Sequence, residues 1–248
     1  MSNEITFEGD SLEYEQLASA TQRCIDELKD TTRMFTFVEI GVRGGLGCYT
    51  MLNTFLKYFT QTQPINQIVI GIGIDPYGNI EYNASETHQN ARMNYTNEMK
   101  NKFLKNMYCL ADKIHFNFLF FSLEDTEFFK RYSDGVPLYL NEKYMLNDYH
   151  LIHFDGPHTL KQVMIETEFF YERSKSKSVY VYYDIINFKK GDPMPKQYAT
   201  EPITKCVFDE QDQIFYFYYN HSIVERWLFA HGFILLRKGL YKASYIRL

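Results

Sequence analysis

Side chains that can bind a ligand or transfer a proton follow five apolar segments of this chain, each at the point where the segment ends. They are Glu39, Asp75, Ser122 with Glu124 and Asp125, Asp155 with His158, and Asp184. The carboxyl ends of parallel strands meet at one edge of a sheet, and ligands bind beyond that edge. Carboxylates there can accept hydroxyl groups or hold a cation, and a histidine can remove a proton near neutral pH. We therefore predict one functional edge that the five segments share.

A glycine-rich turn follows the first of these segments. The apolar run from Met34 to Ile40 leads into Gly41, Gly45 and Gly47, and a helical segment starts near Tyr49. Glycine lets the backbone come close to a ligand and adopt positive φ. The N-terminus of the next helix offers free N–H groups. The turn therefore predicts a cradle for a nucleotide-like ligand.

The turn lacks the Gly-x-Gly-x-x-Gly spacing of a dinucleotide site, because Thr50 stands at the third glycine position. Asp75 also follows later than the roughly 20 residues expected for a ribose-binding acid in that motif. The pattern therefore disfavours a nicotinamide dinucleotide. A nicotinamide-dependent oxidoreductase on a Rossmann-like sheet is kept as an alternative function.

Hydrophobic periodicity predicts the elements that position these residues. The expected helices are 11–34, 49–60, 96–110, 126–132, 159–174 and 221–231. The expected strands are 34–40, 67–74, 113–121, 149–154 and 178–183, a hairpin of 203–208 and 213–219, and a final pair at 233–237 and 240–247. This alternation predicts an α/β fold, with a Rossmann-like, mostly parallel seven-stranded sheet, helices on both faces and an antiparallel C-terminal strand pair.

Size and composition fit one globular domain. The chain has 248 residues, 45% hydrophobic and 23% charged. We expect a single domain over 1–248, with an N-terminal helical extension at 1–33 and a loop and hairpin insertion at 189–219. The formal net charge is −5 and the sequence has no basic cluster, so we expect no nucleic-acid partner. It has no apolar run of membrane-spanning length and no signal peptide, which predicts a cytoplasmic protein without a membrane partner.

Several short motifs at the strand ends carry a family resemblance. They are Val38-Glu39-Ile40-Gly41 with Gly45 and Gly47, Gly73-Ile74-Asp75-Pro76, Ser122, Asp155-Gly156-Pro157-His158, and Val181-Tyr182-Tyr183-Asp184. In this order and spacing they resemble class I S-adenosylmethionine-dependent methyltransferases, over Met34 to Phe188 and the terminal strand pair. The Asp-Gly-x-His segment is similar to that of a subgroup with small-molecule and sugar O-methyltransferases. The resemblance implies methyl transfer to a hydroxyl of a small molecule or sugar.

The resemblance also implies how the cofactor S-adenosylmethionine is held. Glu39 would bind its ammonium group, directly or through water. The turn glycines, Gly41, Gly45 and Gly47, would let the backbone approach its amino-acid end. Asp75 would accept both ribose hydroxyls, and Ser122 would lie beside the adenine.

For the reaction itself, the resemblance implies two alternatives. Asp155 faces the reacting centre, and His158 can remove the proton of the acceptor hydroxyl as a general base. Alternatively, Asp155 and Asp184 hold a divalent cation such as Mg²⁺, which lowers the pKa of that hydroxyl. The chain departs from some metal-dependent relatives here, because Ile185 follows Asp184 where they have a second Asp or Asn.

Structural explanations exist for the same residues. Asp75 can be a turn residue before Pro76, and Asp155 can cap the helix expected near Thr159. His158 can be a helix-start histidine and Asp184 a loop cap. A non-catalytic protein with a methyltransferase fold, acting in binding or scaffolding, is therefore a further alternative.

The acceptor and the assembly are predicted from position alone. We expect the acceptor to enter over the long loops 81–95 and 189–202, with Tyr77, Tyr82 and Tyr198 lining its pocket. The N-terminal helix and the hairpin strand 213–219 are candidate contact surfaces in a homo-oligomer.

Overall fold

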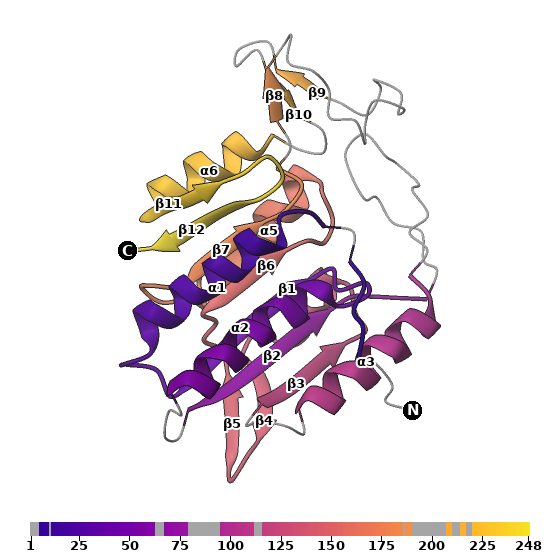
Figure 1. Cartoon of the computed structure of the whole chain (residues 1–248). Coiled ribbons are helices and arrows are strands. Elements are labelled where there is room, and N and C mark those ends of the chain that lie inside the picture. Colours follow the sequence, from indigo (N-terminus) through magenta and orange to yellow (C-terminus); the bar gives the residue numbers. More distant parts are fainter. Residues whose placement is uncertain are drawn as a thin grey trace.

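A seven-stranded sheet forms the centre of the molecule (Figure 1). The computed structural model of the chain describes residues 5–9, 11–62, 67–78, 95–111, 116–185, 187–189, 207–209, 214–216 and 220–248. The strand order is β11-β12-β7-β6-β1-β2-β3. The strands are β1 (Met34–Ile40), β2 (Ile68–Ile74), β3 (Phe116–Phe121), β6 (Leu151–Phe154), β7 (Val179–Tyr182), β11 (Phe233–Lys238) and β12 (Ala243–Arg247).

The direction of the strands confirms the predicted fold class. β3, β2, β1, β6 and β7 are parallel to one another. β12 runs antiparallel to both β7 and β11. The sheet is therefore Rossmann-like and mostly parallel, with an antiparallel C-terminal strand pair, and the carboxyl ends of its five parallel central strands lie at one edge.

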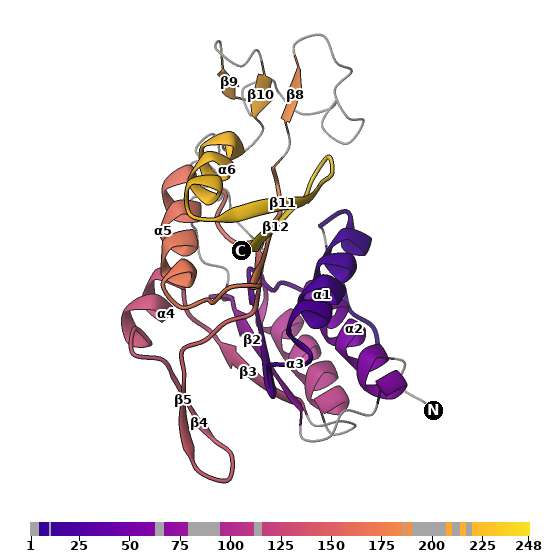
Figure 2. The ribbon, with the colours of Figure 1, turned by 90° about the vertical axis from the view of Figure 1, so that its left-hand side faces the viewer.

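Helices cover both faces of the sheet (Figure 2). One face, here the α1 face, carries α1 (Tyr14–Leu28), α2 (Leu46–Thr62) and α3 (Asn97–Ala111). The other, the α5 face, carries α4 (Asp125–Arg131), α5 (Leu160–Tyr171) and α6 (His221–Ala230). Parallel strands covered on both sides become continuous apolar runs. This is why the sequence located β1 and β2 to within one residue.

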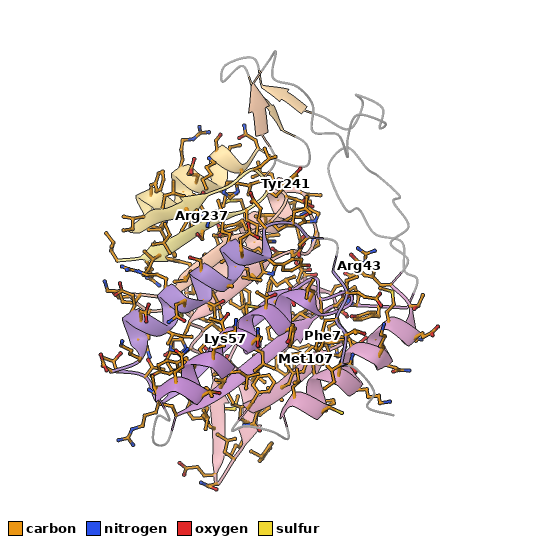
Figure 3. All side chains as sticks on the ribbon, viewed as in Figure 1. Phe7, Arg43, Lys57, Met107, Arg237 and Tyr241 are labelled. Atoms are coloured by element: carbon orange, nitrogen blue, oxygen red, sulfur yellow. The ribbon has the colours of Figure 1, made fainter. Side chains whose placement is uncertain are left out.

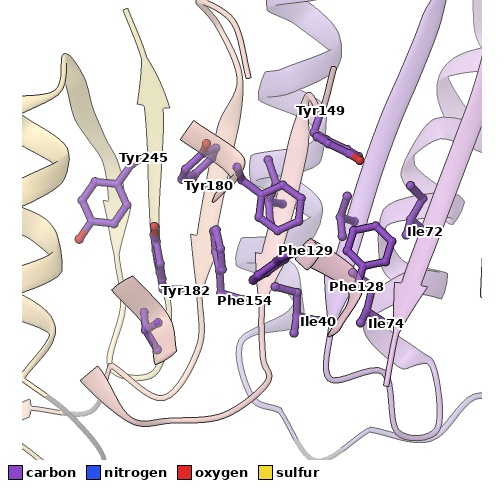
Figure 4. Packing of buried hydrophobic residues seen from close by; sticks show 14 of the residues in the cluster. Ile40, Ile72, Ile74, Phe128, Phe129, Tyr149, Phe154, Tyr180, Tyr182 and Tyr245 are labelled. Atoms are coloured by element: carbon purple, nitrogen blue, oxygen red, sulfur yellow. The ribbon is translucent and has the colours of Figure 1, made fainter. Parts of the chain in front are cut away.

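The core on the α5 face is built largely from aromatic rings (Figure 4). Phe154 stacks on Tyr182 with ring centroids 4.4 Å apart. The buried hydroxyl of Tyr182 pairs with Thr167 at 2.9 Å, and that of Tyr180 pairs with Ser174 at 2.8 Å. A buried tyrosine needs such a partner, because an unpaired polar group in the core is costly. The high Tyr and Phe content of the chain therefore serves packing.

The largest differences between the predicted and observed elements are a predicted first helix that is too long and a hairpin that was not predicted. α1 is shorter than the predicted helix 11–34, because the N–H groups of Thr31 and Thr32 both bond to the carbonyl of Leu28 and close the helix with a turn. The sequence pattern predicts no strand between 133 and 148, yet β4 (Val136–Tyr139) and β5 (Lys143–Leu146) form an antiparallel hairpin there. Strands of four residues are too short to give a clear periodic signal.

The predicted insertion at 189–219 contains a small antiparallel sheet. β9 (Val207–Asp209) pairs with β10 (Ile214–Tyr216), as the predicted hairpin requires, and β8 (Asn187–Lys189) pairs with the other edge of β10. Most of the loops 81–95 and 189–202 lies outside the described residues, as do Tyr82 and Tyr198. The acceptor entrance predicted there stays a prediction.

The segment before α1 crosses the glycine turn. The N–H of Glu8 donates to the carbonyl of Gly44 at 3.3 Å, and the N–H of Leu46 donates to the carbonyl of Glu8 at 3.2 Å. Phe7, labelled in Figure 3, stacks on Tyr49 with ring centroids 4.6 Å apart. This part of the predicted N-terminal extension thus packs on the turn. In the part of the chain that the structure describes, no helix has the length and apolar character needed to cross a membrane.

Candidate functional site

Asp75, at the end of β2, organises the glycine turn. Its Oδ2 accepts hydrogen bonds from the backbone N–H groups of Val42 and Arg43, each at 2.9 Å, and its Oδ1 accepts one from Tyr77 at 3.2 Å. The carboxylate is 1% exposed yet borders a cleft. Asp75 therefore has the structural role of a turn residue, which was one of the two explanations that the sequence allowed. The ribose contact stays a prediction, since each carboxylate oxygen can accept more than one hydrogen bond.

Each of the three turn glycines has a contact within the chain that is too close for a side chain. Gly41 has φ +78°, and a Cβ there would lie 1.9 Å from the carbonyl oxygen of Asp155. A Cβ on Gly47 would lie 1.7 Å from Oε1 of Glu39. Gly45, with φ +82°, lies against the ring of Phe103. The turn is thus packed tightly against β1, β6 and α3, and Gly41 alone of the three borders the cleft.

Glu39, near the end of β1, lies on the α1 face and is buried. Its Oε2 accepts a hydrogen bond from the N–H of Cys48 at 2.6 Å, and its Oε1 lies 3.0 Å from Nδ1 of His153 on β6. Burial is the main reason that the pKa of Glu39 is raised to about 8. Glu39 does not border the cleft. A ligand in the cleft described below therefore does not touch Glu39 through the cleft wall, and the predicted contact of Glu39 with a cofactor ammonium stays a prediction.

A cleft of about 260 Å³ opens at the carboxyl ends of β1, β2, β3 and β6. Its walls are formed by residues 40–41, 74–76, 123–126, 156–157, 159 and 162, together with Tyr95. Ser122 does not border it; the exposed hydroxyl of that residue donates to the carbonyl of Pro76 at 3.3 Å. The cleft lies at the functional edge that the sequence predicts.

Asp125, at the start of α4, borders the cleft after β3, next to Glu124. Its Oδ2 accepts a hydrogen bond from Nε2 of Gln162 at 2.6 Å, and its Oδ1 accepts one from the N–H of Thr126 at 2.8 Å. The sequence places this acid at the edge but gives it no role. Its partner Gln162 comes from α5, 37 residues away, and no local pattern links the two.

Glu166, on α5, was not found from sequence. It is fully buried, close to the carboxyl group of Asp125. Burial raises the pKa of Glu166 well above its usual value, and the charge of nearby Asp125 raises it further. A Cβ on Gly156, in the cleft wall, would lie 3.5 Å from its Oε1. A buried carboxyl group with a raised pKa therefore lies just behind this wall.

His158 and Asp184 come from neighbouring strand ends and lie within hydrogen-bond distance of each other. Nε2 of His158 lies 2.9 Å from Oδ2 of Asp184, and both residues are less than a tenth exposed. Asp184 has φ +56°, a left-handed conformation that is uncommon outside glycine. A carboxylate that holds one imidazole nitrogen fixes the orientation and tautomer of the ring. The structure thus places His158, the predicted general base, next to Asp184, which was predicted as a metal ligand.

Asp155 does not cap α5. The cap is Thr159, whose Oγ1 accepts a hydrogen bond from the N–H of Gln162 at 3.2 Å. The Asp155 side chain is half-buried, and its Oδ2 accepts a hydrogen bond from the hydroxyl of Ser11, in the segment before α1. The helix-cap explanation of Asp155 is therefore wrong, and its two predicted functional roles stay predictions.

Lys242, just before β12, is the second residue that the sequence did not reveal. Its side chain is fully buried, with Nζ 3.1 Å from Nε2 of His153 and 4.0 Å from the centre of the Tyr183 ring. Burial lowers the pKa of Lys242, and the charges of Asp155, Asp184, Glu39 and Glu13 oppose that change. Burial also lowers the pKa of His153 well below its usual value.

Comparison with known proteins gives matches in structure alone. No family model and no curated protein matches the chain. The calicheamicin methyltransferase CalS11 is 14% identical, over 94% of this chain and 78% of that one, with a TM-score of 0.43. The methyltransferase MycE of mycinamycin biosynthesis, in complex with Mg, SAH and mycinamycin VI, is 12% identical, over 95% of this chain and 54% of that one, with a TM-score of 0.44. At such identities the likeness concerns the fold alone.

Proposed function

We propose that this chain is an S-adenosylmethionine-dependent methyltransferase that acts on a hydroxyl group of a small molecule or sugar. The observation that carries the proposal is the cleft at the carboxyl ends of β1, β2, β3 and β6, with Gly41 and Asp75 in its wall. These are the strand ends and two of the residues at which the sequence motifs predict the cofactor. Ligands of open α/β sheets bind at this edge.

The cleft fits the adenosyl part of such a cofactor. Apolar side chains, including Ile40, Ile74 and Leu123, offer surfaces for a planar base, and Asp75 and Asp125 supply acceptors for hydroxyl and amino groups. Gly41 is in the cleft wall, and its backbone lies too close to Asp155 for a side chain at this position. When bound, the cofactor supplies a methyl group on a positively charged sulfur.

The proton of the acceptor hydroxyl would pass to His158. The cofactor would supply the methyl group, and the imidazole of His158 would accept the proton that the acceptor hydroxyl loses as it is methylated. Asp184, 2.9 Å from Nε2 of His158, would hold the ring in the orientation that this proton transfer needs. The negative charge of Asp184 then stabilises the imidazolium that forms.

Ligand-induced stabilisation tests the cofactor. S-adenosylhomocysteine should raise the melting temperature, because a ligand at 100 times its Kd adds about 2.7 kcal/mol to the free energy of unfolding. NADH at the same concentration should leave it unchanged. Stabilisation by NADH alone would favour the oxidoreductase alternative, and no stabilisation by either would contradict the proposal.

A His158 variant separates an enzyme from a binding protein. His158→Gln removes the base without touching the cleft wall, so S-adenosylhomocysteine affinity should stay within about twofold of the wild-type value while turnover falls about 100-fold or more. The measurement is methyl transfer to a panel of sugar and phenolic acceptors, with calorimetric binding as its control. Equal turnover of both proteins would remove His158 from the reaction.

A further inference from the structure

The starts of two helices meet at the end of the cleft that lies beyond β3. Asp125 is the first residue of α4, and Gln162 lies in the first turn of α5. Both residues border the cleft. Nε2 of Gln162 donates a hydrogen bond to Oδ2 of Asp125 at 2.6 Å. The cleft wall here therefore contains a carboxylate and an amide that are joined by a short hydrogen bond.

The chemistry of this pair fixes which groups face each other. A carboxylate only accepts hydrogen bonds, so the amide of Gln162 must turn its NH₂ group, and not its oxygen, towards Asp125. The other oxygen, Oδ1, accepts a hydrogen bond from the N–H of Thr126 at 2.8 Å. Each carboxylate oxygen can accept more than one hydrogen bond. Asp125 therefore presents acceptors to a ligand in the cleft.

Gln162 is itself held in place by its surroundings. Its backbone N–H donates to Oγ1 of Thr159, the cap of α5, at 3.2 Å. The two helices are packed against each other through Phe129, labelled in Figure 4, whose ring stacks on that of Phe169 with centroids 4.1 Å apart. The distance between the start of α5 and the start of α4 is thus set by packing. The amide of Gln162 can therefore orient the Asp125 carboxylate.

A fixed acceptor in the cleft wall discriminates between purine bases. The adenine base of the proposed cofactor carries an amino group, which donates hydrogen bonds. Hypoxanthine has a carbonyl group at the same position of the ring, which accepts them. Two acceptors that face each other leave both groups unpaired, and this is costly in a site without water. An oriented Asp125 carboxylate therefore favours a base with an amino group.

We propose that Gln162 is a positioning residue, which orients the Asp125 carboxylate towards the base and so sets the preference of the cleft for an aminopurine over an oxopurine. Gln162 acts on the base through Asp125, to which its amide donates at 2.6 Å. The inference rests on the proposed function, because that function places a purine base in this cleft. It adds a residue of α5 to the specificity of the cofactor site.

The test compares S-adenosylhomocysteine with S-inosylhomocysteine, which differs in carrying the carbonyl group. Calorimetry should show that the wild-type chain binds the adenosyl compound about tenfold more tightly or better. Gln162→Met keeps the length of the side chain and removes the donor, so the ratio of the two Kd values should fall to about threefold or less. Gln22→Met is the matched control, because Gln22 donates to Asp26 in an exposed pair on α1. It should keep the wild-type ratio.

A second background shows whether Gln162 acts through Asp125. Asp125→Asn places an amide in the wall that can also donate to a carbonyl, so the Kd ratio should fall to about one. Adding Gln162→Met to Asp125→Asn should then leave the ratio unchanged, whereas two independent contacts with the base would give additive effects. Circular dichroism checks the fold of each variant. Gln162→Ala replaces Gln162→Met if the methionine side chain does not fit.

Three results would overturn the inference. They are equal affinities of the wild-type chain for the two compounds, a folded Gln162→Met protein with the wild-type ratio, and an equal effect of Gln162→Met in both backgrounds. Binding of S-adenosylhomocysteine without discrimination contradicts the inference alone and leaves the proposed function intact. If neither compound binds, the proposed function fails, and adenosine and inosine then test the cleft. Equal affinities for these two nucleosides, or no binding of either, would overturn the inference as well.

Discussion

At the scale of single residues, the site is a set of buried polar groups that depend on one another. Glu39 keeps its place because Gly47 has no side chain, and it is held by Cys48 and His153. His158 is held by Asp184. Such networks are stabilising only while every member is satisfied, because a buried unpaired group is costly. The effect of a single substitution here on the free energy of unfolding should therefore depend on whether the residue that it contacts is still present.

Gly47→Ala tests the contact with Glu39. Its Cβ would lie 1.7 Å from Oε1, so the carboxylate must move, and overpacking of this kind costs about 1–3 kcal/mol of unfolding free energy. Urea unfolding measures the loss. In a Glu39→Ala background the same substitution should cost clearly less, because the clashing group is gone. Equal costs in both backgrounds would show that the contact does not matter.

Glu166→Gln tests the buried acid behind the cleft. The pKa of Glu166 is raised well above 4.5, so the folded chain keeps a proton that the unfolded chain releases. Stability from this group is complete below pH 4.5 and is lost as the pH rises towards the folded pKa, by up to about 1.4 kcal/mol per pH unit. The glutamine variant lacks this loss.

Urea unfolding of both proteins between about pH 5 and pH 8 measures the difference. The stability of Glu166→Gln relative to wild type should increase with pH across this range. A difference that stays constant with pH would contradict a protonated Glu166.

At the scale of elements, the sequence predicts strands and strand ends, which have local signals, and misses contacts between residues that are far apart in the chain. β1, β2 and the strand ends at Asp75, Asp155 and Asp184 are marked by apolar runs that stop at a polar residue, which is a local signal. The pairing of Lys242 with His153 joins residues 89 positions apart, and no periodicity encodes it. The hairpin of β4 and β5 was missed because its strands are short, and the end of α1 because its closing turn carries no glycine.

The start of α5 gives a prediction at this scale. Thr159, and not Asp155, caps the helix through its hydroxyl. Thr159→Ala should therefore lower the free energy of unfolding by about 1 kcal/mol, since the N–H of Gln162 loses its acceptor. Thr159→Ser keeps the hydroxyl and should stay close to wild type in the same thermal or urea unfolding experiment. An equal loss in both variants would assign the effect to the methyl group instead.

At the scale of the whole molecule, the first helix and the last strands close the sheet together. The start of α1 binds the turn between β11 and β12 through Glu13, and Ser11 reaches Asp155 at the end of β6. Segments more than 200 residues apart thus meet at the functional edge. The alternation of elements predicts the mostly parallel sheet. No sequence pattern assigns the N-terminal segment a part in the site, because its contacts are made by single polar side chains.

Glu13→Ala tests this closure. Three backbone N–H groups lose a charged acceptor, which should cost about 1–3 kcal/mol of unfolding free energy, less where water can replace the carboxylate. Glu15→Ala, at an exposed position of the same helix turn, is the matched control and should change stability by less than about 0.5 kcal/mol. Similar values for the two variants would mean that the contact of Glu13 with the last turn contributes little.

The central claim is that the cleft beside Asp75 binds the adenosyl part of a sulfonium cofactor. A crystal structure of the chain soaked with S-adenosylhomocysteine tests it most directly. The claim predicts the base between Ile74 and Leu123, and the ribose hydroxyls about 3 Å from the Asp75 carboxylate. S-adenosylhomocysteine bound away from this cleft, or a cleft without ligand density at saturating concentration, would contradict the claim.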